Sequence, residues 1–231
     1  MSDSRFHFLL AVFIGIGIIA AGGCSPVENV AGVVLATANP TATSDAISTS
    51  VPLTRTLEKD FVGTVISINY PETWQTSESG QSISAFDPGT ADSGGPGIGL
   101  FVALTRTVGV DAGEEGIAPV IMSRFLARGA EFGAVPREAV PDEAAAYPFT
   151  WGGHDAALYR WTSSENDTVG VQLLVLDGAK RRFVIIGAQA SKAYWTDFEP
   201  TLHNILATFT LDGETLPIDD VIAALNAFPT P

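Results

Sequence analysis

The nucleophilic and metal-ligating side chains of this sequence are few. It contains one cysteine, Cys24, and three histidines, of which His154 and His203 lie far from the N-terminus. Zinc sites draw three or four ligands mainly from cysteine and histidine, so this set is too small and we predict no metal site. His154 precedes Asp155, and such a pair could supply half of a catalytic triad. Adjacent side chains rarely orient one another by hydrogen bonding, so we assign the pair no catalytic role.

Carboxylates, in contrast, are abundant, with 26 Asp and Glu residues in the chain. Near the C-terminus Asp212, Glu214, Asp219 and Asp220 offer oxygen ligands for Ca²⁺. Their spacing does not follow the twelve-residue calcium-binding loop, so we favour a solvated acidic segment. Two carboxylates with different pKa values could also form the acid–base pair of a hydrolase. The sequence does not select such a pair, and the alternative stays open.

Motifs for nucleophilic catalysis and for phosphate binding are incomplete. The segment 92–95 (Asp-Ser-Gly-Gly) lacks the leading glycine of a Gly-x-Ser-x-Gly elbow. The glycine-rich segment 94–99 is not followed by Gly-Lys-Ser/Thr, as a phosphate-binding loop requires. We therefore predict no catalytic residue and no cofactor.

The charge balance excludes one class of partner. With 12 basic residues against 26 acidic ones, the formal net charge is −14. Nucleic-acid binding depends on a basic surface that contacts phosphates, so no nucleic-acid partner is expected. Acidity also keeps a protein soluble, and it would keep a domain away from anionic lipid headgroups.

Aromatic residues are the remaining candidates for a ligand site. Trp151, Tyr159 and Trp161 are close in sequence, and we expect Trp74 to approach them. Tyr159 and Trp161 fall on one face of a strand because side chains alternate along it. These four residues could line a ligand groove, but packing in the core is the interpretation that we favour.

The N-terminus carries the clearest functional signal. Arg5 precedes the 14 apolar or small residues of 8–21, a run shorter than the ~20 residues of a membrane-spanning helix but suited to a signal peptide. Gly22, Gly23 and Cys24 follow. This order resembles a bacterial lipoprotein signal, which implies cleavage before Cys24 and attachment of lipid to its thiol. An uncut signal anchor, with Cys24 incidental, is the alternative.

Composition divides the rest of the chain. Residues 24–55 are rich in Ala, Thr, Ser and Pro and predict a flexible tether. Residues 56–212 contain the large apolar side chains of one domain, and 213–231 form an acidic tail with the spacing of a short helix. We expect that helix to dock on its own domain, with a partner as the alternative. The lipid would hold the domain outside the cytoplasm, on the cell membrane or the outer membrane.

Several segments have the pattern of β-strands. Residues 64–70 and 82–86 alternate and are rich in β-branched side chains, and 98–107 and 156–161 are further candidates. The runs 169–176 and 182–188 flank Asp177-Gly178, a pair that suits a tight hairpin because glycine accepts a positive φ.

Two amphipathic helices are expected between and after these strands. The first begins near Pro119, buries Ile121 and ends at Gly129. The second runs from Thr196 to Ala207, with Pro200 in its first turns. Hairpins together with widely separated helices predict an α+β fold, an antiparallel sheet covered by helices.

In 68–74 (Ile-Asn-Tyr-Pro-Glu-Thr-Trp) a predicted strand ends in Tyr-Pro with a tryptophan close behind. This opening resembles that of PsbP-like domains, which include extrinsic photosystem proteins and many bacterial domains of unknown function. Two later segments, 182–187 and 204–209, are similar to the family's late strand and closing helix. The resemblance implies an α/β/α sandwich and does not fix a function.

These observations favour a non-enzymatic binding or interaction module, displayed at the membrane through Cys24. Its partner would be an envelope protein or a small ligand. The alternatives are the carboxylate hydrolase and a structural accessory subunit of an envelope complex.

Overall fold

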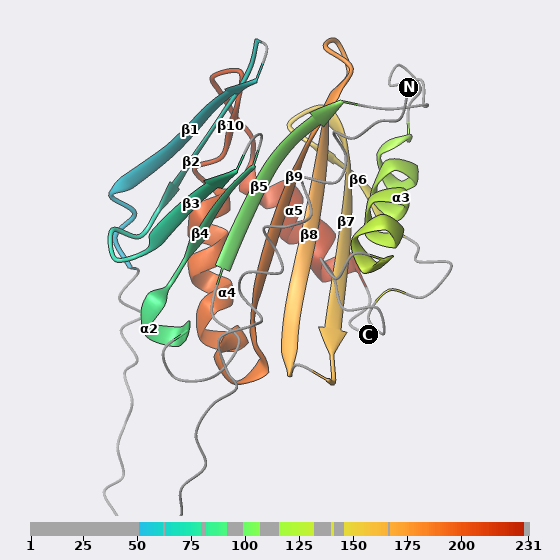
Figure 1. The fold of residues 1–231 in the computed structure, drawn as a ribbon. Helices are drawn as coiled ribbons and strands as arrows, with labels where there is room; N and C mark the ends of the chain where they lie inside the picture. The colour runs from blue at the N-terminus through green and yellow to red at the C-terminus, as the bar shows by residue number, and fades with distance from the viewer. Residues whose placement is uncertain are drawn as a thin grey trace, which may run out of the picture.

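All strand pairs that the structure describes are antiparallel (Figure 1). The computed structural model of the protein describes residues 51–61, 63–79, 82–91, 99–106, 116–131, 140, 146–165 and 167–228. The larger sheet has seven strands in the order β3-β4-β5-β9-β8-β7-β6, and the smaller has four in the order β1-β2-β10-β11. The predicted α+β class is confirmed.

The strands are β1 (Arg55–Phe61), β2 (Thr64–Tyr70), β3 (Gln75–Ser79), β4 (Ser82–Phe86), β5 (Gly99–Arg106), β6 (Tyr147–Trp151), β7 (His154–Ser163), β8 (Thr168–Asp177), β9 (Arg182–Ser191), β10 (Thr210–Leu211) and β11 (Glu214–Thr215). The helices are α2 (Pro88–Ala91), α3 (Ala118–Glu131), α4 (Lys192–Leu206) and α5 (Ile218–Ala227). Each predicted strand is present, and β6 lies at the end of a segment, 135–148, that its Pro- and Ala-rich sequence left unassigned.

The central strands are buried on both faces. Nine of the ten residues of β8 are buried, and so are nine of the ten in β9. Their runs of Val, Leu and Ile do not alternate with polar residues, which is the pattern of a strand covered on both sides. The sheet therefore needs a layer on each face.

One layer consists of α4, α5 and the smaller sheet. Helix α4 contacts β9 of the larger sheet and β2 of the smaller one. Its buried stripe packs in the same core cluster as side chains of both sheets. This cluster includes Leu202, Ile205 and Leu206 of α4, Ile66 and Ile68 of β2, and Val184 and Ile186 of β9.

Helix α3 forms the layer on the opposite face. Ile121, Met122 and Leu126 pack in a second cluster with Leu174 and Ile185 of the central strands. The predicted helix is confirmed, but its predicted end is wrong because Gly129 lies inside α3, which continues to Glu131. A glycine within a helix costs only about 1 kcal/mol relative to alanine, which the packing of α3 offsets.

Helix α4 also differs from its predicted bounds. It begins at Lys192, ahead of Thr196, so Pro200 lies in the middle of the helix rather than in its first turns. Proline removes one backbone hydrogen bond there. Trp195 and Phe198 before it and Leu202 after it are all buried, so burial on both sides of Pro200 holds the helix together.

The hairpin between β8 and β9 confirms the predicted pairing and corrects its turn. Asp177 pairs with Arg182, which leaves a loop of residues 178–181 rather than a two-residue turn. The positive φ belongs to Arg181, at 55°, and not to Gly178. The two-residue turn is found instead between β6 and β7, where Gly152 and Gly153 have φ values of 57° and 84°.

The C-terminal segment packs on the domain. Strand β11 pairs with β10, and Val221, Ala224 and Leu225 of α5 belong to the core cluster of the α4 face. Phe228 then contacts Tyr147 and Tyr159 edge to face, with ring centroids 6.2 and 6.1 Å apart. Residues 214–228 therefore share a core with the strands that precede them.

No helix in the described part of the chain is both long and apolar enough to cross a bilayer. The apolar run 8–21, Cys24 and the predicted tether up to residue 50 lie outside the described residues.

Two glycines on the α3 face of the sheet make room for large neighbours. A Cβ atom at Gly170 would lie 2.2 Å from Cε2 of Trp161, which is the residue opposite it on β7. A Cβ atom at Gly187 would lie 2.6 Å from Oε1 of Gln172 on β8. The indole is rigid and 2% exposed, whereas the end of the glutamine side chain can rotate.

We expect Gly170→Ala to lower the free energy of unfolding by about 2–3 kcal/mol because the indole cannot yield. Gly187→Ala should cost less than about 1 kcal/mol. Urea denaturation followed by fluorescence measures both. In a Trp161→Leu background the cost of Gly170→Ala should shrink, and an unchanged cost would show that Trp161 does not set it.

Candidate functional site

The four aromatic residues considered as a groove do not lie together. Trp74 and Trp151 belong to the core cluster on the α4 face of the larger sheet. Tyr159 and Trp161 share one strand face, as predicted, and belong to the cluster on the α3 face. The proposed grouping is therefore wrong, because Trp151 is on β6 and its side chain points to the side of the sheet opposite Tyr159.

Each of these side chains is part of the packing of its layer. Trp151 stacks on Phe209, with ring centroids 5.1 Å apart, and Trp74 lies against Phe198 at 6.2 Å. Trp151 and Trp161 each bury an indole N–H that has no partner in the described part of the chain. Because they lie on opposite faces of a sheet, one ligand cannot bind both.

The histidine and carboxylates singled out in the sequence have separate structural partners. His154 Nδ1 lies 3.0 Å from the carbonyl oxygen of Leu176, whereas Asp155 accepts a hydrogen bond from the backbone N–H of Ala118 at the start of α3. Asp220 accepts one from the N–H of Gly152. Among the described residues, no three His, Cys, Asp or Glu side chains gather as metal ligands.

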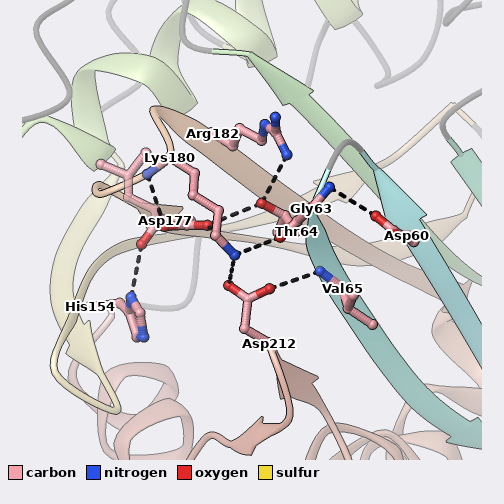
Figure 2. Close-up of polar contacts among 10 residues, drawn as sticks. Asp60, Gly63, Thr64, Val65, His154, Asp177, Lys180, Arg182 and Asp212 are labelled. Carbon is pink, nitrogen blue, oxygen red and sulfur yellow. Dashed lines mark hydrogen bonds and ion pairs between the residues drawn. The ribbon is translucent and has the colours of Figure 1, made fainter.

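The polar groups that do converge lie at one end of the domain. Each of these groups lies in or beside a turn that joins the two strands of a hairpin. The turns are at Gly63 (β1–β2), 152–153 (β6–β7), 178–181 (β8–β9) and 212–213 (β10–β11). Figure 2 shows hydrogen bonds that join three of them, with Lys180 contacting both Gly63 and Asp212. His154, directly after the 152–153 turn, lies against the carbonyl oxygen of Leu176. We call these four turns and the residues beside them the hairpin end.

A buried threonine links the two sheets at the hairpin end. Thr64 of β2 is 0% exposed, and its hydroxyl donates to Oδ2 of Asp177 at 3.1 Å. The same hydroxyl oxygen accepts a hydrogen bond from the guanidinium of Arg182 at 3.1 Å. Asp177 and Arg182 are themselves 5% and 8% exposed. Each buried charge therefore has a polar partner, as burial requires.

Lys180 makes the second link. Its ammonium donates to the carbonyl oxygen of Gly63 at 2.7 Å, lies 3.6 Å from Oδ2 of Asp177 and pairs with the carboxylate of Asp212. Asp212 also accepts a hydrogen bond from the N–H of Val65 at 2.9 Å. Its backbone has a φ of 53°, an uncommon conformation that these contacts stabilise.

These contacts shift two pKa values in opposite directions. The hydrogen bond to Asp212 raises the pKa of Lys180 above 10.5, although partial desolvation opposes it. Partial burial acts to raise the pKa of Asp212, but the hydrogen bonds from Lys180 and Val65 outweigh it and hold that pKa below 3.8. General acid–base catalysis favours pKa values near the working pH. Both shifts move the pKa values farther from neutral pH, so both groups stay charged there. This pair therefore suits charge pairing better than proton transfer.

The sequence analysis named Asp212 only as a calcium candidate and missed Thr64, Lys180 and Arg182. The one signal was Lys180-Arg181-Arg182, a run of consecutive basic residues that is separated from the Asp177-Gly178 pair by one alanine in an acidic chain. Its partners Thr64 and Asp212 are more than 30 residues away in sequence, so no local pattern reveals them.

Comparison with solved structures finds a likeness to cyanobacterial PsbP (CyanoP) from Synechocystis sp. PCC 6803. The TM-score is 0.47, with 9% identity over 75% of this chain and 99% of that chain. A protein of Bacteroides thetaiotaomicron VPI-5482 aligns with a TM-score of 0.34 and 13% identity over 63% of this chain and 44% of its own. No family model and no curated protein matches the sequence. The likeness to PsbP concerns the fold alone, the level at which the sequence motifs indicated it.

Replacing Thr64 tests the link between the sheets. Thr64→Val keeps the shape but leaves Asp177 and Arg182 without their shared partner, so we expect a loss of about 1–3 kcal/mol in the free energy of unfolding. Thr56→Val on β1 removes an exposed hydroxyl bonded to Asn69 and should change it by less than about 0.5 kcal/mol. Equal effects in chemical denaturation would contradict a special role for Thr64.

The Lys180–Asp212 pair predicts a pH dependence. Because the pKa of Asp212 is lowered in the folded state, its contribution to stability is present above pH 3.8 and is lost as the pH falls through the lowered pKa. Because the pKa of Lys180 is raised, its contribution is present below pH 10.5 and is lost as the pH rises through the raised pKa.

The stability difference between wild type and Lys180→Met should therefore be constant from about pH 5 to 9 and shrink outside that range. Denaturation across a pH series measures it. Lys180→Arg, which keeps the charge, should be nearly as stable as wild type across the same pH series. A difference that does not vary down to pH 2 would show that the charge pair contributes nothing.

Proposed function

We propose that the protein is an extracytoplasmic lipoprotein whose domain is a non-enzymatic interaction module. Cys24 would carry the lipid, and residues 25–54 would tether the domain at some distance from the membrane. The observation that carries the proposal is the order of features along the chain. An apolar run, two glycines and the lone cysteine precede a stretch of 30 residues without an aromatic side chain, and the first strand then begins at Arg55.

The place where the chain enters the domain supports this arrangement. Arg55 pairs with Tyr70, at the end of the β1–β2 hairpin remote from its turn. Figure 1 shows the chain reaching β1 at the lower end of the view, while the hairpin turns lie at the upper end. If residues 25–54 form a flexible coil, their root-mean-square span is about 30 Å. The hairpin end would then be remote from the attachment point and open to partners.

The chemistry of the hairpin end supports a module that binds rather than catalyses. Its charged side chains pair with one another, and the shifts in the pKa values of Lys180 and Asp212 lead away from neutrality. A charge pair of this kind suits a structural role better than proton transfer, which favours a non-enzymatic module.

The test is the intact mass of protein extracted from membranes, for wild type and Cys24→Ala. We expect a mature chain that begins at Cys24 and carries acyl mass, and we expect Cys24→Ala to lack both the acyl mass and retention by the membrane. Several acyl chains on one residue hold a protein stably because each buried CH₂ contributes about 0.8 kcal/mol.

Ser25→Ala is the matched control, since it changes the neighbouring small residue and should keep the acyl mass. A chain that begins at Met1 with an unmodified Cys24 would contradict the proposal. The run 8–21 would then act as an uncut anchor.

A further inference from the structure

The outer side of helix α3 carries exposed arginines beside an exposed valine. Val120, Arg124 and Arg128 lie four residues apart along α3, so they form one stripe on its surface. All three are exposed, and so is Ala127 beside them. Val120 is 42% exposed. Among the described residues the other exposed large hydrophobic side chains are Val51, which precedes β1, and Tyr194 on α4. We call this stripe the arginine face.

Most basic side chains of the described domain are bound to the protein itself. Three lysines and one arginine form ion pairs, and one arginine lies over an aromatic ring. These are Lys59 with Glu78 at 3.3 Å, Arg160 with Glu199 at 3.7 Å, Lys192 with Asp167 at 3.7 Å, Lys180 with Asp212, and Arg55 at 5.6 Å from the Tyr70 ring centroid. Arg128, Arg181 and Arg182 also have interactions within the protein. Of the lysines and arginines whose side chains the structure describes, Arg124 is the one without such a contact.

An uncommitted arginine is notable in this chain because its acidic residues outnumber its basic ones by 26 to 12. A carboxylate-bearing partner would supply the counter-charge that Arg124 lacks in the described part of the chain. Arginine is among the side chains enriched in protein–protein interfaces.

We propose that the arginine face of α3 docks an acidic, amphipathic segment of another protein. A carboxylate of that segment pairs with Arg124, and one of its apolar side chains covers Val120. The acidity of the rest of the surface repels such a segment and so directs it to this face. The proposal rests on the role as an interaction module and gives that module a binding surface and a class of partner.

The position of α3 favours a protein over an anionic membrane as the partner. Helix α3 packs along β7, and Figure 1 shows it on a flank of the larger sheet with its axis along the strands. The arginine face is therefore on the side of the domain and not at the end where the chain enters β1.

The test uses the full chain in neutral detergent and a labelled helical peptide with two glutamates four residues apart beside a leucine. Fluorescence anisotropy measures its affinity, with glutamine and lysine versions of the peptide for comparison. We expect only the glutamate peptide to bind wild type, with an affinity that falls as salt is added. Arg124→Glu should weaken binding of the glutamate peptide about tenfold or more, and Val120→Asp should also weaken it. Arg124→Glu should instead bind the lysine peptide, because the charges are then reversed on both sides.

The matched controls are Tyr194→Asp on α4, an exposed hydrophobic residue, and Arg55→Glu on β1, an exposed arginine. Both should leave the affinity unchanged, and circular dichroism confirms that every variant is folded. Equal binding of the glutamate and glutamine peptides, or equal loss in the control variants, would overturn the proposal. Phosphatidylglycerol vesicles that bind wild type but not Arg124→Glu, without peptide binding, would assign the face to lipid instead.

The peptide experiment does not depend on the lipid at Cys24, because the detergent-solubilised chain presents α3 with or without acyl mass. Failure to bind the peptide therefore leaves the lipid anchor untouched. Absence of acyl mass likewise leaves the arginine face untouched.

Discussion

The architecture depends on the burial of both faces of β8 and β9. Their side chains are apolar on each side, and burial of apolar surface contributes roughly 25 cal/mol per Å². Neither strand can have a solvated face, so a layer must form on each side of the larger sheet. Helix α3 supplies one, and α4, α5 and the smaller sheet supply the other.

The smaller sheet is positioned by polar contacts as well as by apolar packing. Thr64 connects β2 to Asp177 and Arg182 of the central hairpin, and Lys180 reaches Gly63 and Asp212. Apolar contacts tolerate small displacements, whereas hydrogen bonds to buried charges have defined distances and are costly to break. This network therefore gives the sheets one relative position and also holds most of the basic charge of the hairpin end.

The hairpin end and the outer side of α3 differ in how their charged groups are paired. The hairpin end is rich in charge, but its ammonium and carboxylate groups neutralise one another. The outer side of α3 keeps an arginine with no partner in the described part of the domain, beside the exposed Val120. With the chain entering at Arg55, a tethered domain would present both surfaces away from its attachment point. This division is the physical basis of the proposal that the domain is an interaction module.

The sequence by itself determined the local elements, because periodicity and turn residues act over a few neighbours. It predicted the strands around 64–70 and 169–188, the helices near Ile121 and Leu202, and the α+β class. It misplaced the ends of α3 and α4, since burial of Phe198 and Leu202 overrides the preference of Pro200 for a first turn, and packing does the same for Gly129.

Only the tertiary structure decided which side chains meet. It separated Trp74 and Trp151 from Tyr159 and Trp161, because the strand order and the pairing register determine the face on which each residue lies. It also brought Thr64 to Asp177, 113 residues away. Contacts at that separation depend on the packing of whole layers, which no local pattern in the sequence encodes.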